Sequence, residues 1–576
     1  MSRNRALVLA FLVAGCGAPG AGLPTTRASA LPAGWRFARP PEPVAGRYAM
    51  VVSDHALATA VGLEVLRRGG NAIDAAVAVG FALAVVHPQA GNIGGGGFLV
   101  YRAADSRAFT LDYREAAPAA ATRDMYLDAA GRMTDRSLTG ALAVGVPGSV
   151  AGLAEMHRRF GRLPWRDLVE PAIRLARDGF VVDSARAHAF ADTTSRKRLR
   201  RFPSTMAAFF RHDEPPARGD TLRQGDLART LQLIADSGAA AFYRGGIADR
   251  IVSEMQKSGG IITRDDLERY QAKWREPLET TYRGWTIIGM PPPSSGGVTV
   301  AEILNILEGY DPLPAAGSTP LLHLWIEAMR RAFTDRNRFL GDPDFVAMPL
   351  ARLTGKPYAA ELRRGIDPRR ATPSTALPAV VEGTNTTHYS IVDPEGNAVA
   401  ITTTLNDDFG SALTVEGAGF LLNDEMDDFA SKPGSPNLYG LVQGEANAIA
   451  PGKRMLSAMA PTIVLDPSGR LALVAGSPGG PRIISAVAQV VSNVIDHGMS
   501  LAEAVCAPRI HHQGEPDSLF FEAGSIPAGQ RRALEAMGHA FRDRPLTIGD
   551  VNAVLVTPLG LQGLADPRRS GGAAGW

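Results

Sequence analysis

The sequence predicts a layered α/β fold, with helices packed on strands that come from distant parts of the chain. A helical segment with a glycine break spans 56–86, and β-rich segments lie at 98–102 and again at 386–406. Helices alternate with loops from about 150 to 370, and another helical run covers 483–495. Strands near both ends of a chain, with helices between and after them, favour layers of helix and sheet.

Composition places the chain among near-neutral globular proteins. Hydrophobic residues make up 45% of the 576 residues and charged residues 20%, which excludes global disorder. There are 60 Lys and Arg residues against 58 Asp and Glu, so the net charge is only +2. A net charge this small gives no overall electrostatic attraction to nucleic acid or to an anionic membrane. We therefore expect neither as a partner of the folded body.

The N-terminus has the pattern of a bacterial export signal. Two arginines precede an apolar run over 6–14 that is too short to span a bilayer. Its end, Leu-Val-Ala-Gly-Cys, resembles a lipobox, so we expect 1–15 to be a lipoprotein-type signal peptide and Cys16 the lipidation site. Residues 16–45, rich in Pro, Gly and Ala, would be a flexible tether. A plain secretory signal is the alternative, and both place the protein in the periplasm or on a lipid anchor in the cell envelope.

Two features near the start of the folded body are expected to be structural. The apolar run 75–86 is short and stops before a proline, which favours a buried helix. A glycine-rich turn at 91–97 leads into the strand 98–102 and invites comparison with nucleotide-binding loops. It lacks the phosphate-loop lysine, and a strand follows it instead of a helix, so we expect close backbone packing.

The segment 386–406 predicts a β-hairpin, because two β-rich runs flank a Pro-Glu-Gly-Asn turn. If the turn centres on Glu395, Thr386 lies opposite Thr404, with Cβ atoms about 5 Å apart and the hydroxyls within hydrogen-bond reach. Asn406 falls on the same face as Thr404, because side chains alternate along a strand. A bulge would break this register.

Thr386 has the setting of a possible nucleophile. A threonine hydroxyl needs a base, and its own α-amine can serve when the chain is cut just before it. That amine has a pKa of about 7.7–8.0, so a useful fraction is neutral near pH 7. On the hairpin alone, a threonine-rich strand chosen for β propensity remains the other interpretation.

Further motifs follow one another along most of the chain. They lie at 69–76, 94–98, 112–115, 386–390, 426–429, 432–434, 436–437, 439–442, 476–480 and 565–568. In sequence and order they resemble the γ-glutamyltransferases, which belong to the N-terminal-nucleophile hydrolases. The resemblance extends from about residue 45 to the C-terminus.

This resemblance implies a four-layer αββα sandwich built by two subunits of one self-cleaving precursor. The cut would fall between Asn385 and Thr386, giving a large subunit, 46–385, and a small catalytic subunit, 386–576. The implied reaction cleaves the γ-glutamyl amide of glutathione through a threonyl acyl-enzyme. Water, an amino acid or a peptide then accepts the glutamyl group, and no cofactor is expected.

The resemblance also implies the catalytic groups. Thr386 is the nucleophile and Thr404 orients its hydroxyl. Gly479 and Gly480 form the oxyanion hole, which suits their place before a proline and the helical run 483–495. One such donor typically contributes about 2.7–4 kcal/mol. A simple tight turn is the alternative for the two glycines.

A γ-glutamyl donor carries an α-carboxylate and an α-ammonium, and the resemblance assigns residues to each. Arg114 binds the carboxylate, for which a guanidinium is well shaped. Asn406, Glu425 and Asp428 bind the ammonium, and the i, i+3 spacing of the two acids puts them on one side of a helical turn. Without the family, Arg114 would be assigned to a surface salt bridge and the acidic run 424–428 to a solvated face. That run lacks the calcium-loop pattern, so no metal is expected.

Three further positions bear on specificity. Ser457 matches a carboxylate-binding serine of the family, but the next residue, usually a second serine, is Ala458. This change keeps open a related acylase acting on glutaryl-cephalosporin or poly-γ-glutamate donors. A non-catalytic envelope lipoprotein is a further alternative. Tyr439 lies in a segment resembling the lid of bacterial members, which excludes water and favours transfer.

Other reactive side chains are expected to be structural. His511 and His512 lack partners at metal-binding spacing, and His388 is assigned to packing. Cys506 lies in an apolar helical context and is expected in the core. No Gly-x-Ser-x-Gly motif occurs, which argues against an α/β-hydrolase mechanism.

Overall fold

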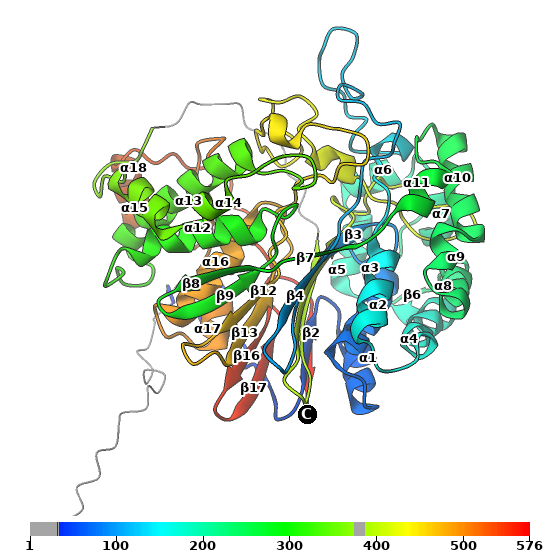
Figure 1. Ribbon diagram of the computed structural model, residues 1–576, viewed down its shortest axis with the longest axis horizontal. Helices are drawn as coiled ribbons and strands as arrows, with labels where there is room; N and C mark the ends of the chain where they lie inside the picture. Colours follow the sequence, from blue (N-terminus) through cyan, green and yellow to red (C-terminus); the bar gives the residue numbers. More distant parts are fainter. Residues whose placement is uncertain (1–30, 33, 374–385) are drawn as a thin grey trace, which may run out of the picture.

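Two seven-stranded sheets form the centre of the fold, and helices cover the outer face of each (Figure 1). The computed structural model describes residues 31–32, 34–373 and 386–576. The predicted signal peptide, Cys16 and Asn385 therefore lie outside the described residues. No helix in the described part of the chain has the length and apolar character needed to cross a membrane.

Each sheet joins strands that are far apart in sequence. The first sheet runs, in spatial order, β18 (Gly572–Gly575), β2 (Met50–Ser53), β10 (Thr387–Val392), β11 (Ala398–Thr404), β3 (Gly96–Arg102), β4 (Ala108–Tyr113) and β7 (Lys273–Arg275). The second runs β1 (Val44–Gly46), β17 (Gly560–Leu564), β16 (Asn552–Thr557), β13 (Leu471–Gly476), β12 (Thr462–Leu465), β9 (Trp285–Gly289) and β8 (Leu278–Tyr282). Two short pairs complete the strands: β5 (Phe180–Val181) with β6 (Thr221–Leu222), and β14 (Ile510–His511) with β15 (Phe520–Phe521).

Helices separate into two groups by position along the chain (Figure 1). On the side of the first sheet lie α1 (Ala56–Arg67), α2 (Ala72–Val86), α3 (Ser149–Phe160), α4 (Trp165–Asp178), α5 (Ser184–Ala191), α6 (Thr193–Leu199), α7 (Pro203–Phe209), α8 (Gly225–Ser237), α9 (Ala240–Tyr243), α10 (Gly246–Ser258) and α11 (Arg264–Arg269). On the side of the second lie α12 (Gly296–Glu308), α13 (Thr319–Phe339), α14 (Leu350–Leu353), α15 (Lys356–Arg364), α16 (Arg482–Ile495), α17 (Leu501–Cys506) and α18 (Ala528–Ala536). Short 3₁₀ turns are η1 (Ala141–Ala143), η2 (Glu425–Asp428) and η3 (Glu445–Asn447).

Alternation along the strands of the first sheet divides the apolar core into two layers. Val51 and Ile401 belong to the cluster that includes the α1 and α2 side chains. Their neighbours Val52 and Ala400 point the other way, into the cluster that contains Val464 of the second sheet. Period-two alternation thus lets one sheet pack against helices on one face and against a sheet on the other. The order is helix, sheet, sheet, helix, which confirms the predicted layered fold.

The helical segment predicted over 56–86 is two helices that meet at the expected glycine break. Asn71 caps α2: its Oδ1 accepts from the Asp74 N–H at 2.9 Å, and the Asp74 carboxylate accepts from the Asn71 N–H at 3.0 Å. This capping box satisfies two amides that the first turn leaves without helical partners. Every residue of α2 is buried, as its apolar sequence predicts.

Candidate functional site

The hairpin has the register that the sequence predicts. Thr387 of β10 pairs with Thr403 of β11, and the ladder continues without a shift to the turn. Thr386 immediately precedes β10, so the next step along the ladder sets it opposite Thr404. Asp393 fixes the turn, because its Oδ1 accepts from the N–H groups of Glu395 and Asn397 at 2.9 Å each.

One small cavity collects nearly all of the predicted site residues. It is lined by Arg114, Arg336, Thr386, Thr404, Asn406, Glu425, Asp428, Tyr439, Leu441, Ser457, Ala458, Met459, Gly480, Pro481 and Ile483. Gly479 is the predicted residue that this lining leaves out, and it borders an adjacent cavity of about 350 Å³. The site cavity has a free volume of about 20 Å³, room for about one water molecule.

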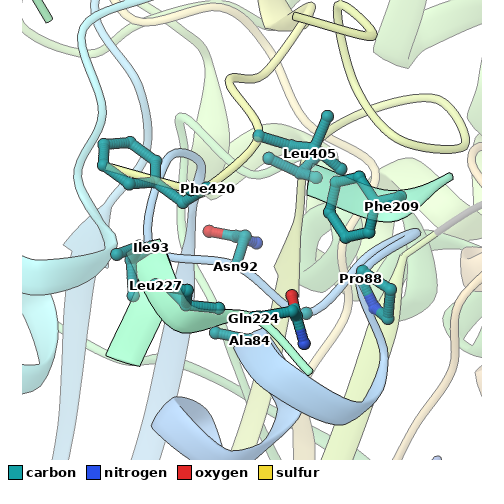
Figure 2. A pocket seen from close by; sticks show the side chains of 12 residues that line it. Ala84, Pro88, Asn92, Ile93, Phe209, Gln224, Leu227, Leu405 and Phe420 are labelled. Atoms are coloured by element: carbon teal, nitrogen blue, oxygen red, sulfur yellow. The ribbon is translucent and has the colours of Figure 1, made fainter. Parts of the chain in front are cut away.

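Asn92, which the sequence analysis missed, holds the end of β11. Its Nδ2 donates to the carbonyl oxygen of Thr404 at 2.8 Å, while its Oδ1 accepts from the Gly95 N–H at 2.9 Å and from Ser149 Oγ at 2.6 Å. Figure 2 shows Asn92 in the middle of a small pocket, with the ring of Phe420 to one side. These buried hydrogen bonds of the Asn92 side-chain amide fix the backbone beside the candidate nucleophile.

The glycine-rich turn packs closely against the strand it supports, as predicted. A Cβ atom on Gly95 would lie 2.1 Å from the Thr404 carbonyl oxygen. One on Gly94 would lie 2.2 Å from the carbonyl oxygen of Leu421. Real Cβ atoms do not approach oxygen this closely, so only glycine fits here without moving the backbone. β3 begins at Gly96, two residues before the predicted strand, because Gly96 and Gly97 also pair with β11.

Asn406 follows β11 with a left-handed backbone, φ 85°, which asparagine tolerates better than most residues. Its backbone N–H donates to Thr404 Oγ at 2.8 Å, so the Thr404 hydroxyl proton is directed away from that amide. Its side-chain Nδ2 donates to the carbonyl oxygen of Asp424 at 3.0 Å. Its Oδ1 accepts from the Tyr439 hydroxyl at 2.6 Å.

Arg114 lies at the centre of a buried ion-pair cluster. Its Nη1 is 2.6 Å from Glu425 Oε2 and 3.5 Å from Glu115 Oε2, and its Nη2 pairs with Asp428. Glu425 and Asp428 are the two ends of η2, so the i, i+3 spacing does bring both acids to one side. The Arg114 side chain is fully buried. The solvated alternatives for Arg114 and the acidic run are therefore excluded.

Protonation of this cluster follows from its burial. Burial raises the pKa of Glu115 to about 7, although Arg114 opposes the shift. Burial also raises the pKa of Glu425 well above its usual range and raises that of Asp428. Burial lowers the pKa of Arg114, but the adjacent acids outweigh it and raise the value above normal. Burial thus favours the protonated forms of these three acids, whereas an entering cation would favour their ionised forms.

Gly479 and Gly480 form the approach to α16. Their φ angles are 132° and 56°, and their carbonyl oxygens accept from the N–H groups of Arg482 and Ile483. Within the described residues neither glycine N–H donates to a protein acceptor. Pro481 is the N-cap of α16, which begins at Arg482.

Ser457 and Ala458 lie beside the start of α12. The Ser457 carbonyl oxygen accepts from the N–H and the hydroxyl of Ser295, at 2.7 and 2.6 Å. Ser457 Oγ accepts from the Met459 N–H at 3.1 Å. Ala458 offers a methyl group to the cavity where a serine would offer a donor.

Arg336 of α13 also lines the cavity, although the sequence analysis did not select it. Its side chain is buried, with Nε donating to Ser295 Oγ at 2.9 Å and Nη1 to Asn337 Oδ1 at 2.8 Å. A signal was present: Arg336 continues the buried stripe that contains Ala332 and Phe333 at helical spacing, and a charge on such a stripe is unusual.

The remaining reactive residues have structural partners. His388 hydrogen-bonds to Thr402 Oγ1 at 2.9 Å and to Ser390 Oγ at 3.0 Å, and burial lowers its pKa to about 3. His511 is buried and hydrogen-bonds to Ser485 Oγ at 2.7 Å. Cys506 is buried, and burial raises the pKa of its thiol to about 12.

One group of possible metal ligands among the described residues lies apart from the cavity lining. His323, Glu327 and His539 have ligand atoms within 4.8 Å of one another. His323 Nδ1 already hydrogen-bonds to His539 Nε2 at 2.8 Å, and Glu327 pairs with Arg331 at 2.6 Å. Arg330 lies 3.4 Å from the same carboxylate, so cations already occupy the position a metal would need.

Comparisons with known proteins agree on one family. The profile of the Gamma-glutamyltranspeptidase family matches residues 58–576. The chain is 49% identical to a glutathione hydrolase proenzyme of Pseudomonas sp. (strain A14), over 92% of this chain and 95% of that protein. It is 48% identical to the glutathione hydrolase proenzyme of Escherichia coli (strain K12), over 91% of each.

A solved structure gives the same result at the level of the fold. The cephalosporin acylase from Bacillus halodurans aligns with a TM-score of 0.82 and 27% identity, covering 93% of this chain and 97% of that one. The match in sequence over most of the chain, together with the four-layer architecture, settles the classification. The chain belongs to the γ-glutamyltranspeptidase family.

Proposed function

We propose that this protein is a self-processing γ-glutamyltransferase that acts on glutathione and related γ-glutamyl compounds. The observation that carries the proposal is the convergence of Thr386, Thr404 and Gly480 with the Arg114 ion-pair cluster on one cavity. Such a reaction needs a nucleophile with an α-amine, backbone amides at a helix start, and a charged cluster that binds a zwitterion.

The proposed activation step is cleavage between Asn385 and Thr386, giving a heterodimer of 46–385 and 386–576. In the uncut chain the Thr386 nitrogen is an amide and cannot act as a base. After cleavage it is an α-amine with a pKa of about 7.7–8.0, adjacent to its own hydroxyl. Relatives named as proenzymes support this step.

In the proposed acylation, Thr386 Oγ attacks the γ-amide carbonyl carbon, and the α-amine takes the hydroxyl proton. The N–H groups of Gly479 and Gly480 stabilise the oxyanion, because they have no competing acceptor among the described residues. Thr404 orients the nucleophile. The leaving amine takes the proton from the α-ammonium of Thr386. Water, or the amine of an amino acid or peptide, then gives a proton to the α-amine and attacks the ester carbonyl carbon. The C–O bond to Thr386 breaks, the proton returns to Thr386 Oγ, and the glutamyl product leaves.

The donor's charged end is proposed to enter the ion-pair cluster. Its α-ammonium would contact Asn406 Oδ1, Glu425 and Asp428, and its positive charge would oppose the rise in pKa that burial causes in the two acids. Its α-carboxylate would contact Arg114 and Ser457. Tyr439 would then cover the donor and limit access of water.

The alternative reaction is acylase chemistry on glutaryl-cephalosporin or poly-γ-glutamate donors. Ala458 keeps it open, because the family usually has a second carboxylate-binding serine at this position. Turnover of γ-glutamyl-anilide and glutaryl-anilide separates the transferase from a glutaryl acylase, since these donors differ only in the α-amine. A γ-glutamyl preference supports the transferase, whereas a glutaryl preference would move the protein to the acylase branch.

Processing is tested on the same preparations. Purified wild-type protein is expected to give two chains, the smaller beginning at Thr386 by N-terminal sequencing. The variant Thr386→Ala is expected to stay one chain and to release no anilide. A wild-type protein that remains a single chain and turns over neither donor would favour a non-catalytic envelope lipoprotein.

We also propose export to the cell envelope with Cys16 as the lipidated N-terminus. The basic residues, the short apolar run and the Leu-Val-Ala-Gly-Cys sequence support this. Fractionation of cells expressing wild type and Cys16→Ala tests it. We expect wild type in the membrane fraction and the variant in the soluble periplasmic fraction, and equal fractionation of both would exclude the anchor.

A further inference from the structure

Arg336 is a buried cation that the proposed mechanism has not used. Its side chain is 2% exposed, and within the described ranges it forms no ion pair. Its two hydrogen bonds go to the neutral oxygens of Ser295 and Asn337, and Nη2 has no partner in the same part of the chain. Burial of a charge is costly unless an opposite charge compensates for it.

The surroundings of Arg336 differ from those of Arg114. Arg114 is already in contact with Glu425, Asp428 and Glu115, so a donor carboxylate reaching it must approach three acids. Burial lowers the pKa of Arg336 to about 10, with some compensation from Asp428, so it remains a cation at neutral pH. The cavity therefore has one guanidinium that is paired with acids and one that forms no ion pair among the described residues.

Arg336 is also placed beside the position where the family serine is absent. Its Nε donates to Ser295 Oγ, and that hydroxyl donates to the carbonyl oxygen of Ser457. Arg336 and Ala458 line the same cavity. The guanidinium is thus next to the chain segment that the resemblance assigns to the carboxylate.

We propose that Arg336 is a second binding residue for the α-carboxylate of the donor and supplies the contact that Ala458 cannot make. This inference rests on the proposed function and deepens it. A charged guanidinium makes a stronger hydrogen bond to a carboxylate than a neutral hydroxyl does. The site would then select donors that carry both an α-ammonium and an α-carboxylate.

Two donors that differ only in the carboxylate test this assignment. They are γ-glutamyl-anilide and 4-aminobutanoyl-anilide, which keeps the amine and lacks the carboxylate. For Arg336→Met we expect KM for the first donor to rise about tenfold to a hundredfold, with little change in kcat and no change for the second donor. Arg338→Met is the matched control, since Arg338 is an exposed arginine on the same helix. Equal losses on both donors would overturn the proposal and leave Arg336 a structural role.

Two further variants keep the test decisive. Arg336→Lys retains the charge without the planar fork, so its KM rise should be smaller and still confined to the carboxylated donor. It replaces Arg336→Met if that variant fails to fold. Ala458→Ser in the Arg336→Met background should recover part of the lost affinity, because it adds a hydroxyl donor beside the same carboxylate. No recovery, together with losses on both donors, contradicts the assignment.

Failure of the proposed function would be visible separately. If wild type turns over neither donor, the transferase proposal fails, and calorimetric titration with glutamate and with 4-aminobutanoate still tests Arg336. A preference for glutamate that disappears in Arg336→Met supports the carboxylate assignment. An equal preference in both proteins overturns it.

Discussion

The hydroxyl of Tyr439 donates a 2.6 Å hydrogen bond to Oδ1 of Asn406, which joins two residues of the cavity lining. The same hydroxyl lies 3.0 Å from the Asn406 carbonyl oxygen. A Cβ atom on Gly480 would lie 2.8 Å from the Tyr439 ring, so this ring also packs on the backbone of the candidate oxyanion hole. One tyrosine thus contacts a proposed ammonium ligand and a proposed oxyanion donor.

Tyr439→Phe should weaken donor binding while leaving the fold intact. The ring would still pack on Gly480, but Asn406 Oδ1 would lose the hydrogen bond from the tyrosine hydroxyl that orients it. A neutral hydrogen bond contributes about 0.5–1.5 kcal/mol, so KM for γ-glutamyl-anilide should rise about two- to tenfold. Tyr126→Phe is the control, because the Tyr126 hydroxyl bonds to the Leu142 carbonyl away from the cavity lining. Similar KM values in wild type and Tyr439→Phe would contradict this role.

Gly95→Ala should damage processing through the backbone of β11. The new methyl group would press on the Thr404 carbonyl oxygen, which lies 2.1 Å from an ideal Cβ. Overpacking of this kind costs about 1–3 kcal/mol and should displace Thr404 from Thr386. We expect a lower melting temperature and slower appearance of the small chain on a gel.

Gly529→Ala is the matched control for that experiment. Gly529 lies in α18 and an added Cβ would meet nothing within 4 Å. Alanine in a helix is favoured over glycine by up to about 1 kcal/mol, so stability should hold or rise and processing should be unchanged. If both alanine variants process at the wild-type rate, close packing at Gly95 does not position Thr404.

Glu115→Gln should change how stability depends on pH. Burial raises the pKa of Glu115 from 4.5 to about 7, so the folded state holds this proton more tightly than the unfolded state. The resulting stability is fully present below about pH 4.5 and is lost as pH rises through about 7. The loss at pH 8 is up to about 3 kcal/mol, and glutamine, which does not ionise, should avoid it.

The measurement is the melting temperature of wild type and Glu115→Gln at several pH values from 4.5 to 8. The difference between the two proteins should move in favour of the variant across this window. A constant difference would mean that Glu115 does not change its protonation between the folded and unfolded states. The surface variant Arg338→Met, purified in the same way, serves as the reference for pH effects common to the whole protein.

Asp428→Asn should reduce discrimination between γ-glutamyl and glutaryl donors. Asp428 pairs with Arg114 and is proposed to contact the α-ammonium, which glutaryl donors lack. A hydrogen bond to a charged group contributes about 1.5–3 kcal/mol, so kcat/KM for γ-glutamyl-anilide should fall at least about tenfold relative to glutaryl-anilide. Glu445→Gln, which removes an exposed partner of Arg123, should leave the ratio unchanged. An unchanged ratio in Asp428→Asn would exclude the ammonium role.

Local pattern determined part of the site by itself. The turn residues and the alternation of 386–406 predict the hairpin register, because a short turn leaves few ways to pair two adjacent strands. Because the segment 91–97 lacks a phosphate-loop lysine, the sequence predicts that its glycines serve close backbone packing, and the structure confirms this. The family motifs identified Arg114, Glu425 and Asp428, although their spacing alone could not distinguish a buried cluster from a solvated face.

Tertiary structure decided which of these side chains meet and what charge each one carries. Asn92 and Arg336 come from segments far from the hairpin in sequence. No local sequence pattern shows that Asn92 contacts a strand carbonyl or that Arg336 lines a cavity. Glu115 is an ordinary acid in the sequence, and its pKa of about 7 arises from burial, which outweighs the opposing charge of Arg114. The sequence determined the strands, the glycines and the family, while packing of distant segments set the electrostatics, because burial and charge pairing depend on neighbours in space.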